Sequence, residues 1–402
     1  MSVASGFVGS RLLEARRARR IMASDLADMA NVSVQSISKY ENEHQTPRHE
    51  VVERFASVLG MPWEYFFRQK AESDPKPVFW RSKLSAQTSS LDRALVRLDW
   101  LKETVDYLGE FFDFPELNLP YVTVPNSIYD LRFEDIEEIA KIVRDFWGVN
   151  RGPLPDVIDY IESTGILVSR IHVDAEKVDA FSQWSDRHSI PFIMLSRDKA
   201  SAVRQRFDAL HELGHIILHK NITQKELNHR ETYKLLEEQA HFFAGCMLMP
   251  ERDFVHELYA PTLDAMLSMK ERWGTSVAAM IMRCKNLDLL NDDGAKRLWI
   301  NYSRRGWRKG EPFDGKMDKE QPFLIRRSFE LLISEGVQSV PDIRNSLPFP
   351  VEDLEEMTDV DKGTFGGSKG SRAEPKFKST PSEGKKTWLT LRDLRRGENI
   401  FG

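Results

Sequence analysis

The sequence contains little cysteine and no long hydrophobic run. Its 402 residues include two cysteines, Cys246 and Cys284, which excludes a disulfide scaffold and a zinc site built from thiolates. No apolar stretch approaches the ~20 residues that a membrane-spanning helix needs, so we expect no membrane association. Any metal must therefore bind to histidines and carboxylates, and a reducing cytoplasm is the expected location.

A strong net charge of either sign is also absent. The formal net charge is −5, and 41% hydrophobic with 30% charged residues is the balance of a soluble globular protein. This excludes a uniformly basic protein that coats nucleic acid. The N-terminal arginines follow a short apolar stretch, which is the opposite of the order in a secretory signal.

Apolar periodicity and turn signals predict an α+β multidomain fold. In order, we expect an all-α helix-turn-helix domain, a linker with a connecting helix, an α+β core, a mixed C-terminal extension and a largely disordered tail. These parts cover residues 1–70, 71–130, 131–290, 291–358 and 359–402. Three short strands are expected in the α+β core, at Ile166–Ile171, Val178–Trp184 and Ile190–Leu195.

Residues 23–41 have the pattern of two short helices joined by a tight turn. Ser33 can cap the second helix, which buries Ile37 and Tyr40. The side chains expected to face outward and read the major groove are Val34, Gln35, Ser36, Ser38 and Lys39. Phosphate contacts are expected from nearby basic residues, namely Arg16, Arg17, Arg19, Arg20 and Lys39.

Residues 7–67 resemble the Xre/Cro-type repressor domain of phage and bacterial regulators, which has five helices. The run from Ser33 to Asn42 carries the resemblance, whereas Met22 departs from it because a Ser or Thr cap is common there. The resemblance implies binding to a double-stranded DNA operator. It also implies a homodimer, since such domains read paired half-sites.

The string HELGH places two histidines, His211 and His215, four residues apart. On a helix these share one face and can bind one Zn²⁺, while Glu212 lies on the rim of that face and can accept a proton from zinc-bound water. Two histidines leave zinc one protein ligand short. We expect Glu237, on a downstream helix, to be the third ligand, with Glu238 as the alternative.

Residues 130–290 resemble the ImmA/IrrE family of bacterial metallopeptidases. The matching runs are RFDALHELGHIILH, EEQAHFFAGCMLMP and RWGTSVAAMIMR. The resemblance implies a zincin-like core with zinc on His211, His215 and Glu237, and with Glu212 as catalytic base. His241 departs from the family, which usually has Asn or Asp there.

Three further residues are candidates for supporting roles in such a site. His241 is expected beside the metal ligands. Tyr233 or His229, with Arg230 as the alternative, is expected to polarise the scissile carbonyl or stabilise its oxyanion. We expect Ile190–Leu195 to form a sheet edge that pairs with substrate backbone, with an interior strand as the alternative.

Together the resemblances imply a DNA-binding transcriptional regulator that carries a site-specific zinc endopeptidase. Its expected substrate is a helix-turn-helix repressor, an antitoxin-like protein, or the chain's own linker near residues 69–90. One alternative is a transcription factor whose zincin-like domain senses a ligand or stress without proteolysis. Another is a component of a toxin–antitoxin or phage-defence system. An intact Glu212 favours the enzyme, because a sensor has no need of a catalytic base.

Overall fold

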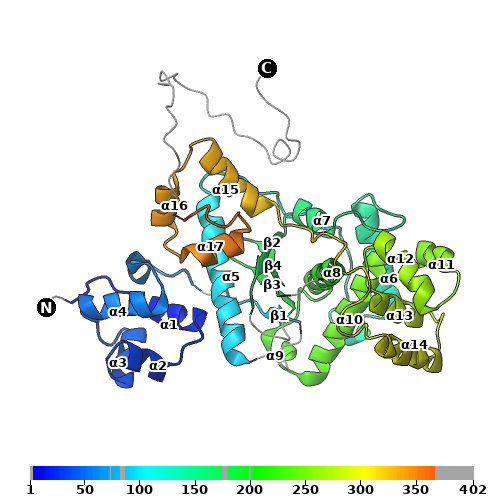
Figure 1. Cartoon of the computed structure of the whole chain (residues 1–402), viewed down its shortest axis with the longest axis horizontal. Coiled ribbons are helices and arrows are strands. Elements are labelled where there is room, and N and C mark those ends of the chain that lie inside the picture. The colour runs from blue at the N-terminus through cyan, green and yellow to red at the C-terminus, as the bar shows by residue number, and fades with distance from the viewer. Residues whose placement is uncertain (1–2, 73, 82–86, 174–178, 199–200, 367–402) are drawn as a thin grey trace, which may run out of the picture. The chain divides into compact units, whose positions relative to one another are not determined.

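The architecture is that of a computed structural model (Figure 1). The described residues are 3–366 apart from 73, 82–86, 174–178 and 199–200; residues 1–2 and 367–402 lie outside them. Packing divides the chain into two units. The first consists of residues 1–71, 92–115 and the stretch from 324 onward, and the second of residues 72–91 and 116–323.

The first unit begins with the five predicted helices. They are α1 (Gly9–Ala18), α2 (Ala23–Met29), α3 (Val34–Glu41), α4 (His49–Leu59) and the 3-10 helix η1 (Trp63–Phe67). The Ser33 hydroxyl accepts the backbone N–H of Ser36 (3.1 Å), which confirms the predicted cap of α3. Gly60 ends α4 with a φ of +60°, a conformation in which glycine avoids the strain of a Cβ.

Three helices from the predicted C-terminal extension belong to this first unit together with the connecting helix. These are α15 (Leu324–Ser334), α16 (Val340–Ser346), α17 (Val351–Thr358) and most of α5 (Thr88–Leu108). Trp100 stacks on Phe349 (5.2 Å between ring centroids) and donates to the hydroxyl of Tyr65 (3.2 Å). A buried aromatic cluster thus joins residues that are far apart in the sequence.

The start of the predicted disordered tail is ordered. Phe365 is fully buried, and its backbone N–H donates to a carboxylate oxygen of Glu355 (2.9 Å). The disorder predicted for 359–402 therefore does not begin at residue 359. From residue 367 onward that prediction lies outside the described residues.

The second unit contains one four-stranded sheet. Its strands are β1 (Val78–Trp80), β2 (Leu167–Ile171), β3 (Ala180–Ser185) and β4 (Ile190–Ser196), in the order β1-β3-β4-β2 (Figure 1). Strand β3 pairs antiparallel with both β1 and β4, and β2 pairs parallel with β4. The three strands predicted in the core are present, although Val178 lies outside the described residues.

The sheet corrects two expectations. Strand β4 lies between β3 and β2, so the edge position expected for Ile190–Leu195 is wrong and the interior alternative holds. The open side of β3 is covered by β1, which comes from the segment interpreted as a linker. Three apolar residues are enough to add a strand because β3 pairs with all three of them.

Helices make up the rest of the described part of the second unit. They are η3 (Ile128–Asp130), α6 (Phe133–Phe146), α7 (Val157–Ser163), α8 (Ala202–Leu218), α9 (Gln224–Leu227), α10 (Arg230–Leu248), α11 (Glu251–Glu257), α12 (Leu263–Trp273), α13 (Val277–Asn286) and α14 (Asp292–Arg304). Helix α8 packs against β3 and β4 and against α10, which also contacts α6. No described helix has the length and apolar character needed to cross a membrane.

Helices α8 and α10 approach closely because small residues meet at their contact. A Cβ added to Gly214 would lie 3.1 Å from the Phe243 ring and 3.3 Å from the Cα of Ala240. Both distances are tighter than ordinary packing allows. The small residue between the two histidines of α8 therefore sets how near the carboxylates of α10 come to them.

Candidate metal centre

Helices α8 and α10 bring three predicted ligands to one point. The Nε2 atoms of His211 and His215 are 3.0 Å apart, and carboxylate oxygens of Glu237 lie 3.7 Å and 3.3 Å from them. Both imidazoles are buried and Glu237 is nearly so. Among the described residues, these three form the group of histidine and carboxylate side chains able to hold a metal ion.

The spacing of the three ligand atoms fits a tetrahedral ion. Ligands at the ~2.05 Å bond lengths of zinc would be separated by about 3.3 Å at tetrahedral angles. The observed separations of 3.0, 3.3 and 3.7 Å scatter about that value. The donor set, two neutral nitrogens and one carboxylate, is also one that zinc accepts.

A chain of hydrogen bonds runs behind His215 and sets its tautomer. The amide nitrogen of Gln239 donates to the carbonyls of Ile128 (2.9 Å) and Leu131 (3.1 Å), so its oxygen accepts from His219 Nε2 (3.0 Å). Nδ1 of His219 then accepts from Nδ1 of His215 (3.0 Å). This leaves Nε2 of His215 unprotonated and directed at the other ligands, the form a metal requires.

The electrostatics of the ligands favour the same protonation states. Burial holds the pKa of His211 well below its ordinary value, so the imidazole is neutral. Although burial opposes it, the two neighbouring histidines hold the pKa of Glu237 below its ordinary value. A neutral histidine and an ionised glutamate are the metal-binding forms of these side chains.

Glu212 lies beside the three ligands and is fully buried. Its Oε2 accepts the hydroxyl proton of Ser182 on β3 (2.6 Å), while Oε1 has no hydrogen-bond partner among the described residues. Burial raises the pKa of Glu212 well above its ordinary range, the hydrogen bond from Ser182 lowers it, and the charge of Glu237 raises it further. A buried carboxylate oxygen without a partner suits a group that exchanges protons with a bound reactant.

Glu238, the alternative ligand, lies away from the histidines. It is exposed and pairs with Lys234 one turn earlier on α10 (3.7 Å). The geometry therefore selects Glu237 from the two candidates. Consecutive helical residues differ in direction by about 100°, which is why only one of them can face α8.

The three supporting candidates have different surroundings. The ring of His241 is 4.4 Å from that of His211, and its Nδ1 lies 2.7 Å from the Glu237 carbonyl. The hydroxyl of the buried Tyr233 donates to the carbonyl of Trp80 (2.6 Å). His229 is exposed and precedes the first turn of α10.

The sequence reasoning missed Ser182 and Gln239, and it placed the segment around Trp80 in a linker. Ser182 donates to Glu212, and Gln239 accepts from His219. A single serine or glutamine produces no recognisable spacing pattern in the sequence. The apolar run Val78–Trp80 inside a polar stretch was a usable signal. Its position beside α8 follows from strand pairing over about a hundred residues, which periodicity does not reveal.

The predicted DNA-reading face of α3 is open. Val34, Gln35, Ser38 and Lys39 are exposed, and Ser36 is half-buried, with its hydroxyl 2.9 Å from that of Ser33. This leaves the predicted reading side chains on the outer face of α3, which is the geometry that major-groove contact requires.

Two of the four arginines predicted to contact phosphate, Arg16 and Arg17, differ in the structure. The guanidinium of Arg16 donates to both carboxylate oxygens of Glu41 (2.7 and 3.0 Å) and to the carbonyl of Ile21 (3.1 Å). Arg16 thus holds α1 to α3. Arg17 is half-exposed and lies 3.9 Å from Asp92, which leaves it the better placed of the two for phosphate.

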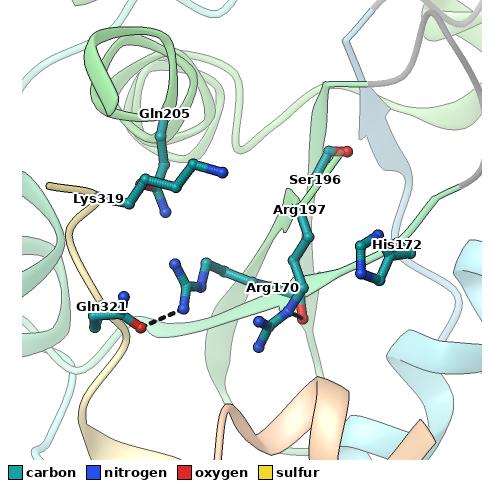
Figure 2. A pocket seen from close by; sticks show the side chains of 7 residues that line it. All are labelled: Arg170, His172, Ser196, Arg197, Gln205, Lys319 and Gln321. Atoms are coloured by element: carbon teal, nitrogen blue, oxygen red, sulfur yellow. Dashed lines mark hydrogen bonds between the residues drawn. The ribbon is translucent and has the colours of Figure 1, made fainter. Parts of the chain in front are cut away.

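A polar pocket lies in the same unit as the candidate metal ligands (Figure 2). It is lined by Arg170, His172, Ser196, Arg197, Gln205, Lys319 and Gln321. Arg170 donates to Gln321, and Arg197 Nε donates to the Arg170 carbonyl (3.1 Å). Burial together with the charges of both arginines lowers the pKa of Lys319, which indicates a concentration of positive charge.

The folds and sites thus define a helix-turn-helix DNA-binding domain joined on one chain to a metallopeptidase-type domain. Residues 12–66 match the family model described as helix-turn-helix. Residues 161–285 match the peptidase M78 family model, described as the IrrE N-terminal-like domain. Both matches confirm the fusion inferred from the motifs, and the second spans the two helices that carry the ligands. No curated protein matches the chain.

Proposed function

We propose that this protein is a DNA-binding transcriptional regulator with a site-specific zinc endopeptidase activity. The single observation that carries the proposal is the convergence of His211, His215 and Glu237 beside the buried Glu212. The helix-turn-helix match on the same chain supplies the regulatory context. We propose a helix-turn-helix repressor or antitoxin-like protein as substrate, with the chain itself as a further candidate.

Six residues near the centre have a defined role in this proposal. His211, His215 and Glu237 hold zinc, which when bound acts as a Lewis acid and acidifies water. Oε1 of Glu212 takes a proton from the nucleophile and returns it to the leaving amine, while Ser182 keeps the carboxylate oriented. Tyr233 donates its hydroxyl proton to the carbonyl oxygen of the bound peptide and stabilises the charge that develops there.

The DNA-binding half completes the proposal. Val34, Gln35, Ser36 and Ser38 read base edges of a double-stranded operator, with Arg17 and Lys39 on the phosphates. A homodimer would match the paired half-sites of such operators, and the cytoplasm is the compartment that contains them. Cleavage of a repressor would then change transcription as part of a stress response.

Metal content tests the ligand set most directly. Elemental mass spectrometry of purified wild type should find about one zinc per chain, the stoichiometry of a single four-coordinate site. Glu237→Gln should lose most of it and Glu238→Gln should retain it. A wild type that takes up no zinc would overturn the peptidase proposal. Cleavage of candidate helix-turn-helix repressors by wild type is then compared with cleavage by Glu212→Gln, the inactive control.

A second candidate function is that of a ligand sensor without proteolysis, and the cationic pocket supports it. Arg170, Arg197 and Lys319 would attract a phosphate-containing ligand. Inorganic phosphate and ATP should raise the melting temperature of wild type relative to chloride of equal ionic strength, and Lys319→Gln should abolish the increase. Equal melting temperatures in all conditions would reject the sensor.

A further inference from the structure

Residues 76–81 extend along β3 in the way a bound peptide would. Phe79 lies opposite Ser182, the residue that holds Glu212, and Trp80 lies opposite Phe181. Hydrogen bonds continue beyond β1 at both ends. Gln183 donates its side-chain amide to the Lys76 carbonyl (2.6 Å), and the Arg81 N–H donates to the carbonyl of Ala180 (3.2 Å). This segment therefore occupies the edge where substrate backbone would add as a strand.

The aromatic side chains of this segment contact the catalytic groups. The ring of Phe79 stacks on the metal ligand His215, with 4.9 Å between centroids. Trp80 stacks on Phe181 (4.5 Å), and its carbonyl accepts the hydroxyl proton of Tyr233. One peptide group thus already receives the hydrogen bond that the proposed mechanism gives to a substrate carbonyl.

The basic residue that follows is bound by a buried acid. Arg81 forms an ion pair with Asp208, and its guanidinium lies 5.4 Å from the centroid of the Phe207 ring. Asp208 is buried on α8, one turn before His211. A carboxylate buried without a cation is costly, so this position is built to receive a positive charge after an aromatic residue.

We propose that residues 76–81 occupy the substrate position of the peptidase in cis. The site then accepts extended peptides with two aromatic residues followed by Arg or Lys, with Phe181 and Asp208 determining specificity. Any external substrate must first displace this segment, so the chain competes with its own substrate. This inference rests on the proposed function, because it assigns a peptide-binding role to the same site.

Binding of a peptide in trans tests the competition. The probe is a fluorescently labelled, C-terminally amidated peptide with the sequence of residues 74–81, DPKPVFWR. It is titrated into the full-length, zinc-loaded Glu212→Gln protein, which binds without turnover. Adding Phe79→Ala and Trp80→Ala should displace the cis segment and tighten peptide binding at least tenfold. The matched control adds Phe313→Ala and Tyr259→Ala, two exposed aromatic residues of the same unit, and should leave the affinity unchanged.

A second variant covers the case in which the double substitution unfolds the protein. Arg81→Gln removes the ion pair with Asp208 but keeps the apolar contacts, and it should also tighten binding of the peptide. Asp208→Asn added to the Phe79→Ala/Trp80→Ala variant should lower the affinity for the Arg-containing peptide about tenfold. This is the loss expected when a charge-assisted hydrogen bond is removed. A peptide with Gln in place of Arg should bind both proteins equally.

The outcomes separate this inference from the proposed function. Equal peptide affinity in folded, zinc-containing proteins with and without the intact segment would overturn the inference while leaving proteolysis untouched. Tighter binding in the segment variants supports it, even if wild type cleaves no repressor. In wild type with zinc, intact mass spectrometry that finds a cut within 76–81 would also support occupancy of the substrate position by this segment.

Discussion

Helices α3 and α8 each carry candidate residues for one proposed activity, but they hold them in opposite environments. The proposed reading side chains of α3 are mainly exposed, with Gln35 and Lys39 directed to solvent. On α8, His211, Glu212 and His215 are at most 1% exposed and held by neighbouring side chains. A surface that binds a large external ligand must stay open, whereas a catalytic group gains from being fixed in advance by the core. Substitutions in α3 should therefore change operator affinity, whereas substitutions in α8 should change zinc binding or the rate of cleavage.

The largest effect is expected from Glu212→Gln. Loss of the proton-transfer group should lower the rate of repressor cleavage by about 10²- to 10⁴-fold. Zinc content and operator affinity should equal those of wild type, because glutamine keeps the size of the side chain and does not alter the ligands. Cleavage rate, elemental analysis and a gel-shift assay measure the three quantities. Retained cleavage would show that Glu212 is not the base.

A smaller effect is expected from Gln239→Leu, which interrupts the hydrogen-bond chain behind His215. Loss of an outer partner of a metal-binding histidine should weaken zinc affinity about 10- to 100-fold. Competition with a zinc chelator measures the change. Gln224→Leu is the matched control, because Gln224 is exposed and bonds only to nearby Asn228 in the described residues. Equal zinc affinities in both variants would show that the hydrogen bonds behind His215 do not contribute to zinc binding.

On the exposed side of the comparison, Gln35→Ala should weaken operator binding by about 1–3 kcal/mol without changing the free energy of unfolding. The slope of affinity against salt concentration should stay the same, because the residue contacts bases. Lys39→Ala should instead reduce that slope by about one unit. A shallower salt slope for Gln35→Ala, or a sequence-dependent loss for Lys39→Ala, would reverse the two assignments.

The smallest effects concern the helix caps around the reading helix. Ser33→Ala removes the cap of α3 and should lower the free energy of unfolding by about 1 kcal/mol. Met22 precedes α2 without a side-chain cap, so Met22→Ser should raise the same free energy by roughly 0.5–1 kcal/mol. Urea unfolding monitored by circular dichroism measures both. Changes of the same sign would contradict the cap assignments.

The sequence predicted the local features of both sites well. The two short helices within residues 23–41, the cap at Ser33 and the pairing of His211 with His215 depend on spacing within one or two helices, which periodicity reveals directly. Glu237 could be predicted as a ligand because zinc needs a third protein ligand besides the two histidines.

What escaped prediction depends on contacts between distant residues. The residues of strand β1 were predicted to be part of a linker, because three apolar residues are too few for a periodic signal. The interior place of β4 depends on which strands flank it, and that is decided by pairing across the chain. Arg16 was assigned to DNA because its ion pair with Glu41, 25 residues away, has no local signature.

The interleaving of the two units limits how the protein can be divided. The chain crosses between them four times, and the DNA-binding unit includes residues on both sides of the peptidase unit. A gene fragment ending at residue 290 would therefore encode a helix-turn-helix without the partners of Trp100 and Arg97, Phe349 and Asp353. A single recombination point anywhere between residues 72 and 323 would therefore separate residues that pack together in the first unit.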